Sequence, residues 1–180
     1  MGNAVSTRLT KEDIDELRSG EISEFTVEEI KSLYERFQRL DKTSSGVISA
    51  HDFELIPELS MNPLCHRIIR LFDSSRLDRV NFRDFVRTLW RFSPRCPPDE
   101  KLRAAFDAYD VDGDGVIGYD DLMYILKLLA GVNLSDEQLR IIVADTISAV
   151  DSSKKGAISL DDFKTNIGIE TANKLLTIHI

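Results

Sequence analysis

The stretch DVDGDGVIGYDD at residues 110–121 decides how the rest of the chain is interpreted. Aspartates stand at its first, third, fifth and twelfth positions, and Gly115 at the sixth position permits a sharp turn. A Ca²⁺-binding loop places oxygen ligands at these four positions, uses the carbonyl oxygen of the seventh residue and often holds water at the ninth. The expected ligands are Asp110, Asp112, Asp114, the carbonyl oxygen of Val116, and Asp121.

The last ligand position departs from the usual pattern. Glutamate normally closes such a loop, but here the closing residue is Asp121. The shorter side chain reaches the ion with one carboxylate oxygen rather than two, which lowers the coordination number. Mg²⁺ is satisfied by about six ligands, whereas Ca²⁺ often takes more. We therefore expect weaker Ca²⁺ binding than in a loop closed by glutamate, with Mg²⁺ competing for the site.

The same pattern recurs in three further windows, residues 41–52, 73–84 and 151–162. Every window begins with aspartate, and apolar residues at helical spacing flank each one. The eighth positions are all β-branched, namely Ile48, Val80, Ile117 and Ile158. Two of the flanking helices begin with capping boxes, Thr26 with Glu29 and Ser135 with Gln138. This repeat is typical of EF-hands, which are helix–loop–helix units whose loops pair through a short strand.

The three other windows have poorer ligand sets. The candidate ligands of window 151–162 are Asp151, Ser153 and Asp162. Lys155 stands at its fifth position and brings a positive charge toward the ion. The first window offers only two carboxylates, and in the second Leu77 takes the fifth position while Asp78 replaces the turn glycine. We expect these windows to be empty or to bind metal weakly.

The repeat predicts an all-α fold of two lobes, each made of two EF-hands whose loops are joined by a short antiparallel β link. Prolines within residues 93–100 indicate the connection between the lobes, because proline cannot continue a helix. An additional short helix is expected near residues 10–19. The predicted segments are an N-terminal arm at 1–25, a first EF-hand pair at 26–92, the linker at 93–100, a second pair at 101–166 and a tail at 167–180.

The helices that follow the second and third windows are apolar on more than one face. A helix with one buried face shows a single apolar stripe, so the additional apolar residues need a second covering surface. We expect a groove that holds an amphipathic helix of a partner protein. Its expected residues are Phe85, Leu89, Trp90, Met123, Leu126 and Leu129. The alternative is that both helices are central in a compact core.

Composition limits the possible functions. The 180 residues include 31 acidic and 23 basic side chains, and the formal net charge of -8 argues against nucleic acid as a partner. No apolar run is long enough to span a bilayer and no signal core precedes the first helix, so a cytoplasmic location is expected. Cys65 and Cys96 support neither a disulfide framework nor a zinc site. His51, His66 and His179 fit no catalytic spacing, and no enzymatic activity is expected.

The N-terminus carries a possible lipidation signal. Residues 1–6, MGNAVS, match the pattern for N-myristoylation, in which Gly2 is acylated after Met1 is removed. A single myristoyl chain gives only weak and reversible attachment to a membrane. Peripheral contact with membranes is therefore a second expected location.

The chain resembles the calcineurin B family, which includes the calcineurin B homologous proteins. The resemblance rests on residues 1–3, Leu33-Tyr34-Glu35-Arg36-Phe37, Ile56-Pro57-Glu58-Leu59, Asn62-Pro63-Leu64 and residues 131–139. It implies a noncatalytic, calcium-binding and often myristoylated regulatory subunit that holds a helix of a phosphatase catalytic subunit or of a sodium/proton antiporter. Residues 80–89 are similar to the antiporter branch, whereas the short linker is similar to calcineurin B, so both partners stay open.

A simple calcium buffer or sensor without a dedicated helix partner is the alternative function. A buffer would need several intact metal loops and little exposed apolar surface. The sequence shows one intact loop and a surplus of apolar helix residues, which favours the helix-binding subunit.

Overall fold

The computed structural model describes residues 9–168 except residues 21, 57–60, 62 and 74–76. Its helices are α1 (Lys11–Arg18), α2 (Val27–Leu40), α3 (Ala50–Glu54), α5 (Cys65–Phe72), α6 (Phe82–Phe92), α7 (Pro98–Tyr109), α8 (Tyr119–Ala130), α9 (Asp136–Val150) and α10 (Leu160–Asn166). Its strands are β1 (Val47–Ile48), β2 (Val80–Asn81), β3 (Val116–Ile117) and β4 (Ile158–Ser159). The predicted all-α fold of paired EF-hands is confirmed. None of the helices in this part of the chain is long and apolar enough to cross a membrane.

The loops pair as the eighth-position pattern predicts. Strand β1 runs antiparallel to β2, and β3 runs antiparallel to β4. Ile48 lies opposite Val80, and Ile117 lies opposite Ile158. All four side chains are buried, because a β-branched residue packs well on the inner side of such a short ladder. In each lobe the two EF-hands are therefore joined through their loops.

Capping boxes fix the predicted helix starts. Thr26 accepts a hydrogen bond from the Glu29 N–H at 3.1 Å, and the Glu29 carboxylate accepts one from the Thr26 N–H at 2.8 Å. Ser135 and Gln138 form the same reciprocal pair at the start of α9. Helix α1 is the additional helix expected near residues 10–19, and it begins with a capping box of its own. Local hydrogen-bond chemistry thus sets these boundaries.

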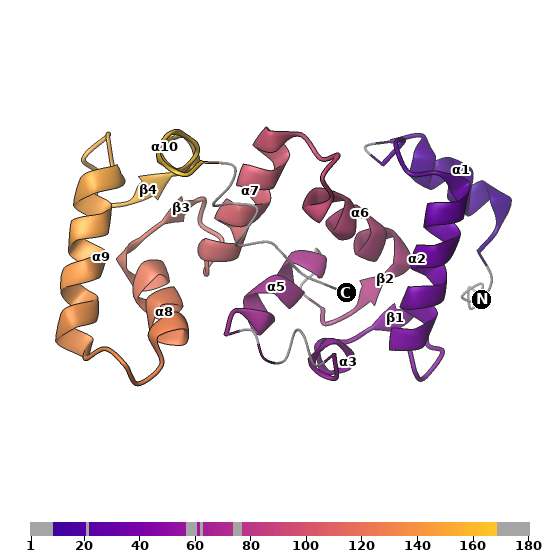
Figure 1. The fold of residues 1–180 in the computed structure, drawn as a ribbon, viewed down its shortest axis with the longest axis horizontal. Helices are drawn as coiled ribbons and strands as arrows, with labels where there is room; N and C mark the ends of the chain where they lie inside the picture. Colours follow the sequence, from indigo (N-terminus) through magenta and orange to yellow (C-terminus); the bar gives the residue numbers. More distant parts are fainter. Residues whose placement is uncertain (1–8, 21, 57–60, 62, 74–76, 169–180) are drawn as a thin grey trace.

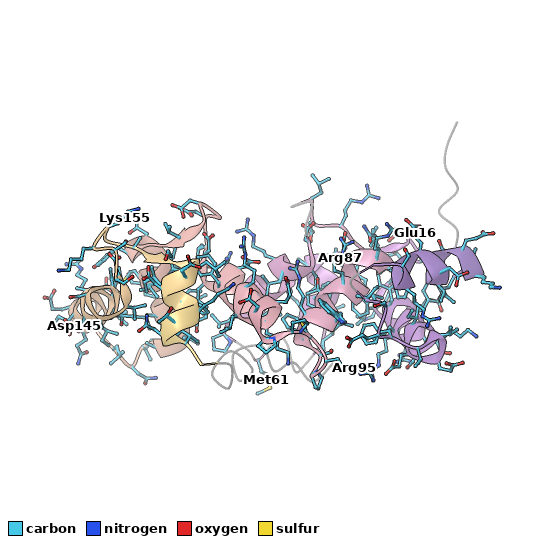
Figure 2. All side chains as sticks on the ribbon, turned by 90° about the horizontal axis from the view of Figure 1, so that it is seen from above. Glu16, Met61, Arg87, Arg95, Asp145 and Lys155 are labelled. Atoms are coloured by element: carbon cyan, nitrogen blue, oxygen red, sulfur yellow. The ribbon has the colours of Figure 1, made fainter. Side chains whose placement is uncertain are left out.

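The molecule is elongated, with α1 and α2 at one end, α5, α6 and α7 in the middle, and α8, α9 and α10 at the other end (Figure 1). Seen from above, Lys155 and Asp145 lie at the end opposite Glu16 (Figure 2). The lobes are not separate bodies joined only by a linker. Helix α5 packs against α7, and Ile125 of α8 belongs to the core of the first lobe. The boundary between the lobes is therefore packed.

The linker is shorter than the predicted 93–100, because α7 already begins at Pro98. Proline suits the first turn of a helix, where its missing N–H costs nothing. The Arg95 guanidinium fastens this linker to the first lobe. It lies 2.6 Å from a carboxylate oxygen of Glu29 and donates a 3.1 Å hydrogen bond to the carbonyl oxygen of Glu24.

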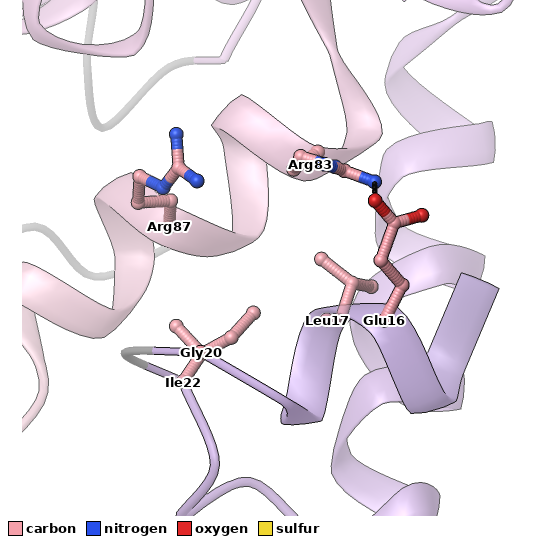
Figure 3. A pocket seen from close by; sticks show the side chains of 6 residues that line it. All are labelled: Glu16, Leu17, Gly20, Ile22, Arg83 and Arg87. Atoms are coloured by element: carbon pink, nitrogen blue, oxygen red, sulfur yellow. Dashed lines mark ion pairs between the residues drawn. The ribbon is translucent and has the colours of Figure 1, made fainter. Parts of the chain in front are cut away.

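Helix α1 is held against α6. Arg83 of α6 forms an ion pair with Glu16 of α1 at 2.5 Å. Ile14 of α1 is buried in the core of the first lobe. A small pocket lies beside this ion pair (Figure 3). The other residues that line it are Leu17, Gly20, Ile22 and Arg87. The additional N-terminal helix is therefore an integral part of the first lobe.

Two residues predicted to line a partner groove lie in the core instead. Phe85 has no exposed surface, and Trp90 is 6% exposed. The Phe85 ring packs against Phe37 and Phe72, with centroid distances of 5.6 and 5.9 Å. The reason is that α6 is covered by α2, α5 and α7, so its second apolar face is used inside the molecule. For these two residues the compact-core alternative is the better interpretation.

Candidate metal centre and partner-binding face

Three predicted metal ligands come together in loop 110–121. Carboxylate oxygens of Asp110, Asp112 and Asp114 all lie within 4.8 Å of one another. Asp110 is buried at the C-terminal end of α7, whereas the other two are exposed. No basic side chain in the described part of the chain forms an ion pair with any of them. Clustered carboxylates repel one another, and a divalent cation relieves that repulsion, so the donor set fits Ca²⁺ or Mg²⁺.

Backbone N–H groups hold these carboxylates in place. Asp110 accepts hydrogen bonds from Gly113 at 2.7 Å and from Gly115 at 3.0 Å. Asp112 and Asp114 each accept one from the residue two positions later, at 3.1 and 2.9 Å. Gly115 has φ +93°, a conformation that L side chains rarely adopt, which is why the sixth position is glycine. Hydrogen bonds from the loop backbone thus orient these carboxylates.

The closing residue, Asp121, lies in the first turn of α8 and outside the cluster of three carboxylates. Its two oxygens accept hydrogen bonds from the N–H groups of Val111 at 3.0 Å and Gly118 at 2.7 Å. Each oxygen keeps a lone pair that can face a metal. Gly118 has no side-chain hydroxyl that could compete for this carboxylate, and the ninth position thereby leaves room for water.

Loop 151–162 uses its candidate ligands differently. The hydroxyl groups of Ser152 and Ser159 both donate to the Asp162 carboxylate, and these bonds place its pKa far below the usual range. The Ser153 hydroxyl donates to Asp151 at 2.8 Å, and this bond lowers the pKa of Asp151. The carboxylates of this loop are therefore already bound by its own hydroxyl groups.

The first loop, and the described residues of the second, keep the turn geometry without a rich ligand set. Asp41 accepts hydrogen bonds from the N–H groups of Ser45 and Gly46. Asp110 accepts comparable bonds in the third loop. Asp78, which replaces the turn glycine of the second loop, has φ +55°. Its carboxylate accepts a 2.6 Å hydrogen bond from the N–H of Ala50 in the neighbouring hand. Asp78 thus joins the two hands rather than serving a metal.

A buried arginine beside the third loop was not anticipated from the sequence. Arg67 of α5 is 4% exposed, and its guanidinium donates hydrogen bonds to backbone carbonyl oxygens at the end of α7 and the start of loop 110–121. The apolar pattern of α5 marks it as a buried helix but gives no sign of a partner so distant in sequence. A charged residue within an apolar helix is the only available signal.

The remaining groove residues are partly exposed. Leu89 of α6 and Met123 and Leu126 of α8 are half-buried, and Leu129 is 47% exposed. Helix α9 packs beside α8 and adds further apolar surface. Beyond Tyr119 at the start of α8, the large exposed apolar residues of this region are Tyr124, Leu129, Val132, Ile141 and Ile142. We call these five residues the α8–α9 face. Gly2 and residues 169–180 of the tail lie outside the described residues.

Comparisons with known proteins agree with this architecture. The family model of an EF-hand domain pair matches residues 99–167. Calcineurin B type 2 of Dictyostelium discoideum is 43% identical over 173 residues, which cover 96% of this chain and 93% of that protein. Calcineurin B of Naegleria gruberi is 40% identical over 180 residues, the full length of both chains. Calcineurin B of Candida glabrata is 41% identical over 158 residues, which cover 88% of this chain and 90% of that protein.

Proposed function

Because the chain belongs to the calcineurin B family of noncatalytic, calcium-binding regulatory subunits, we propose that it binds Ca²⁺ in loop 110–121 and holds an amphipathic helix of a phosphatase catalytic subunit. The carboxylate cluster of the third loop is the observation that supports Ca²⁺ binding. The relatives are named as calcineurin subunits, which favours a phosphatase over an antiporter as the partner.

The proposed metal ligands are Asp110, Asp112, Asp114, the carbonyl oxygen of Val116, and Asp121. No described basic side chain forms an ion pair with the cluster, and the loop backbone donates hydrogen bonds that orient its carboxylates. Ca²⁺ supplies the positive charge that neutralises these carboxylates. Mg²⁺ competes because the short side chain of the closing aspartate reaches the ion with one carboxylate oxygen rather than two, which suits a six-coordinate ion. Loop 151–162 binds more weakly, since serine hydroxyls occupy its closing carboxylate.

The α8–α9 face is the proposed docking surface for the partner helix, together with the half-buried residues Leu89, Met123 and Leu126. Exposed apolar residues gather on two helices that pack together and on the loop between them, and apolar surface of this kind is typical of a helix-binding site. Phe85 and Trp90 support this surface from within the core. Acylation of Gly2 would add reversible contact with a membrane.

Calorimetric titration tests the metal site. Wild type is expected to bind one Ca²⁺ at loop 110–121, and Asp110→Ala is expected to lose this binding because it removes the buried ligand. Asp145→Ala is the matched control, since Asp145 is an exposed aspartate on α9. An unchanged titration in the Asp110 variant would defeat the choice of loop.

Peptide binding tests the partner. Fluorescence anisotropy would compare a labelled helix from a calcineurin catalytic subunit with a cytoplasmic helix from a sodium/proton antiporter. Leu129→Asp is expected to weaken binding of the phosphatase helix about 10-fold or more, because it places a charge in the apolar interface. Leu55→Asp, at an exposed leucine of the other lobe, should leave it unchanged. Preference for the antiporter helix, or equal binding by both variants, would contradict the proposal.

A further inference from the structure

Arg67 joins the two lobes at the metal loop. Its Nε donates to the carbonyl oxygen of Ala108 at 3.0 Å, and its Nη1 donates to that of Val111 at 3.3 Å. Its Nη2 donates to the carbonyl oxygens of Asp107 at 3.3 Å and Asp110 at 2.7 Å. One side chain of the first lobe therefore binds four backbone groups of the second.

Two of these carbonyl groups, those of Asp107 and Ala108, belong to the last turn of α7, and those of Asp110 and Val111 follow it in the loop. The last four carbonyl groups of a helix accept no hydrogen bond from within the helix, and the negative end of the helix dipole lies at this terminus. Helix α7 ends at Tyr109, and loop 110–121 begins with the next residue. A planar guanidinium with five N–H donors matches such a group of acceptors, whereas a lysine ammonium presents only a compact charge.

The charge of Arg67 also has local support. Burial and the neighbouring charge of Arg70 lower the pKa of the guanidinium, whereas Tyr124 and the Asp110 and Asp121 carboxylates favour its charged form. These two aspartates are the first and last proposed ligands of the metal. The positive charge of Arg67 opposes a cation bound at the same carboxylates, so its favourable effect on the loop comes from its hydrogen bonds to the backbone that carries the first ligand.

Apolar packing surrounds this contact. Helix α5 packs against α7, and Ile68 and Ile69, which follow the arginine in α5, are buried in the first core. Val111 of the metal loop and Ile125 of α8 pack against that same core. A movement of residues 107–111 would therefore disturb α5, and a movement of α5 would disturb the start of the loop.

We propose that Arg67 is a positioning residue that couples Ca²⁺ occupancy of loop 110–121 to the packing of α5 against α7. The inference rests on the proposed metal site. Ca²⁺ requires Asp110 and the residues after it to hold one arrangement, and Arg67 stabilises that backbone only while α5 is docked. Ion binding therefore strengthens the joint between the lobes. By reciprocity, the docked α5 raises the affinity of the loop for Ca²⁺ by the same factor.

Hydrogen exchange measured by mass spectrometry tests the coupling in the full chain, with Ca²⁺ and with chelator. In wild type, Ca²⁺ is expected to slow exchange at the amides of α5 about five-fold or more. In Arg67→Met, Ca²⁺ is expected to protect loop 110–121 but no longer α5, and the calorimetric affinity should fall by the factor lost at α5. Arg70→Met is the matched control, because Arg70 is an exposed arginine on the same helix.

Arg67→Lys provides a second variant if the methionine variant does not fold, as judged by circular dichroism. It keeps the positive charge but cannot bind four carbonyl groups at once, so at least half of the α5 protection should be lost. The proposal would be overturned if Ca²⁺ slowed exchange at the α5 amides as much in either Arg67 variant as in wild type. It would also be overturned if bound Ca²⁺ left exchange at the α5 amides of wild type unchanged. A wild-type chain that binds no Ca²⁺ in the calorimeter would instead refute the metal site itself, and the coupling with it.

Discussion

At the scale of single residues, the ninth and twelfth positions distinguish the third loop from the fourth. In loop 151–162 the ninth residue, Ser159, donates its hydroxyl to the closing carboxylate at 2.6 Å. In loop 110–121 the ninth residue is Gly118, which offers only its N–H. A carboxylate that already accepts several hydrogen bonds has fewer lone pairs for an ion. The third loop is therefore better prepared for a metal than a count of aspartates alone suggests.

The closing residue itself yields a prediction. Asp121→Glu is expected to tighten Ca²⁺ binding about 10-fold, or ~1.4 kcal/mol, because the longer side chain can supply both oxygens. Mg²⁺ should gain much less, so the ratio of the two affinities rises. Calorimetric titration with each ion measures this ratio. The neighbouring exposed Asp120→Glu serves as the control, and an unchanged ratio in Asp121→Glu would show that the closing residue does not set metal preference.

The sequence predicts residues whose role depends on near neighbours and misses those whose partners are distant. The three clustered aspartates lie within one loop, so their spacing suffices to predict that they meet. Arg67 binds carbonyl groups that are 40 to 44 residues away, and those groups belong to a backbone that carries no sequence signal. Only the three-dimensional arrangement of α5 and α7 reveals this contact.

At the scale of elements, the start of α2 combines a local and a distant interaction. The Glu29 carboxylate caps the helix through the Thr26 N–H and also pairs with Arg95 of the linker. The sequence predicts the first of these, because the two capping residues lie three apart. It does not predict the second, which depends on how the linker folds back.

This double role predicts a pH dependence. The side-chain hydrogen bond from Arg95 and the backbone hydrogen bond from Thr26 lower the pKa of Glu29 from 4.5 to about 2. A lowered carboxyl pKa stabilises the folded state above pH 4.5, and this stabilisation is lost as pH falls toward about 2. Wild type should therefore have a higher thermal midpoint than Glu29→Gln at pH 7, with the gap closing near pH 2.

Glutamine can keep the capping hydrogen bond but carries no charge, so the comparison removes the ionic contribution of Glu29, of which the pairing with Arg95 is the largest part. Thermal unfolding followed by circular dichroism at several pH values provides the measurement. Glu28→Gln is the control, because Glu28 is its neighbour in the first turn of α2. A gap between wild type and Glu29→Gln that stays constant with pH would show that the ion pair does not stabilise the fold.

At the scale of the whole molecule, packing of the chain on itself explains why two of the groove residues were predicted wrongly. The pattern of α6 indicates two apolar faces, but it cannot say whether a foreign helix or the chain itself covers the second one. Phe85 is covered by aromatic rings of its own lobe. The α8–α9 face keeps exposed apolar residues at the far end of the molecule. The groove prediction therefore keeps its support from α8 and loses it from two residues of α6.

The shared core leads to a final prediction about cooperativity. Ile125 belongs to α8 of the second lobe, yet it is fully buried in the core of the first. Ile125→Ala should lower the free energy of unfolding by about 2–5 kcal/mol, because it leaves a cavity that the surrounding helices cannot fill. Trp90 is the only tryptophan of the chain and lies in the first lobe, so its fluorescence reports that lobe. The urea midpoint from Trp90 fluorescence should therefore fall although the mutation lies in the other lobe.

The control is Leu129→Ala, at an exposed position of α8, which should leave the Trp90 midpoint nearly unchanged. If Ile125→Ala lowered the midpoint measured by far-ultraviolet circular dichroism but not the one measured by Trp90, the lobes would unfold independently and the packed boundary would not couple them.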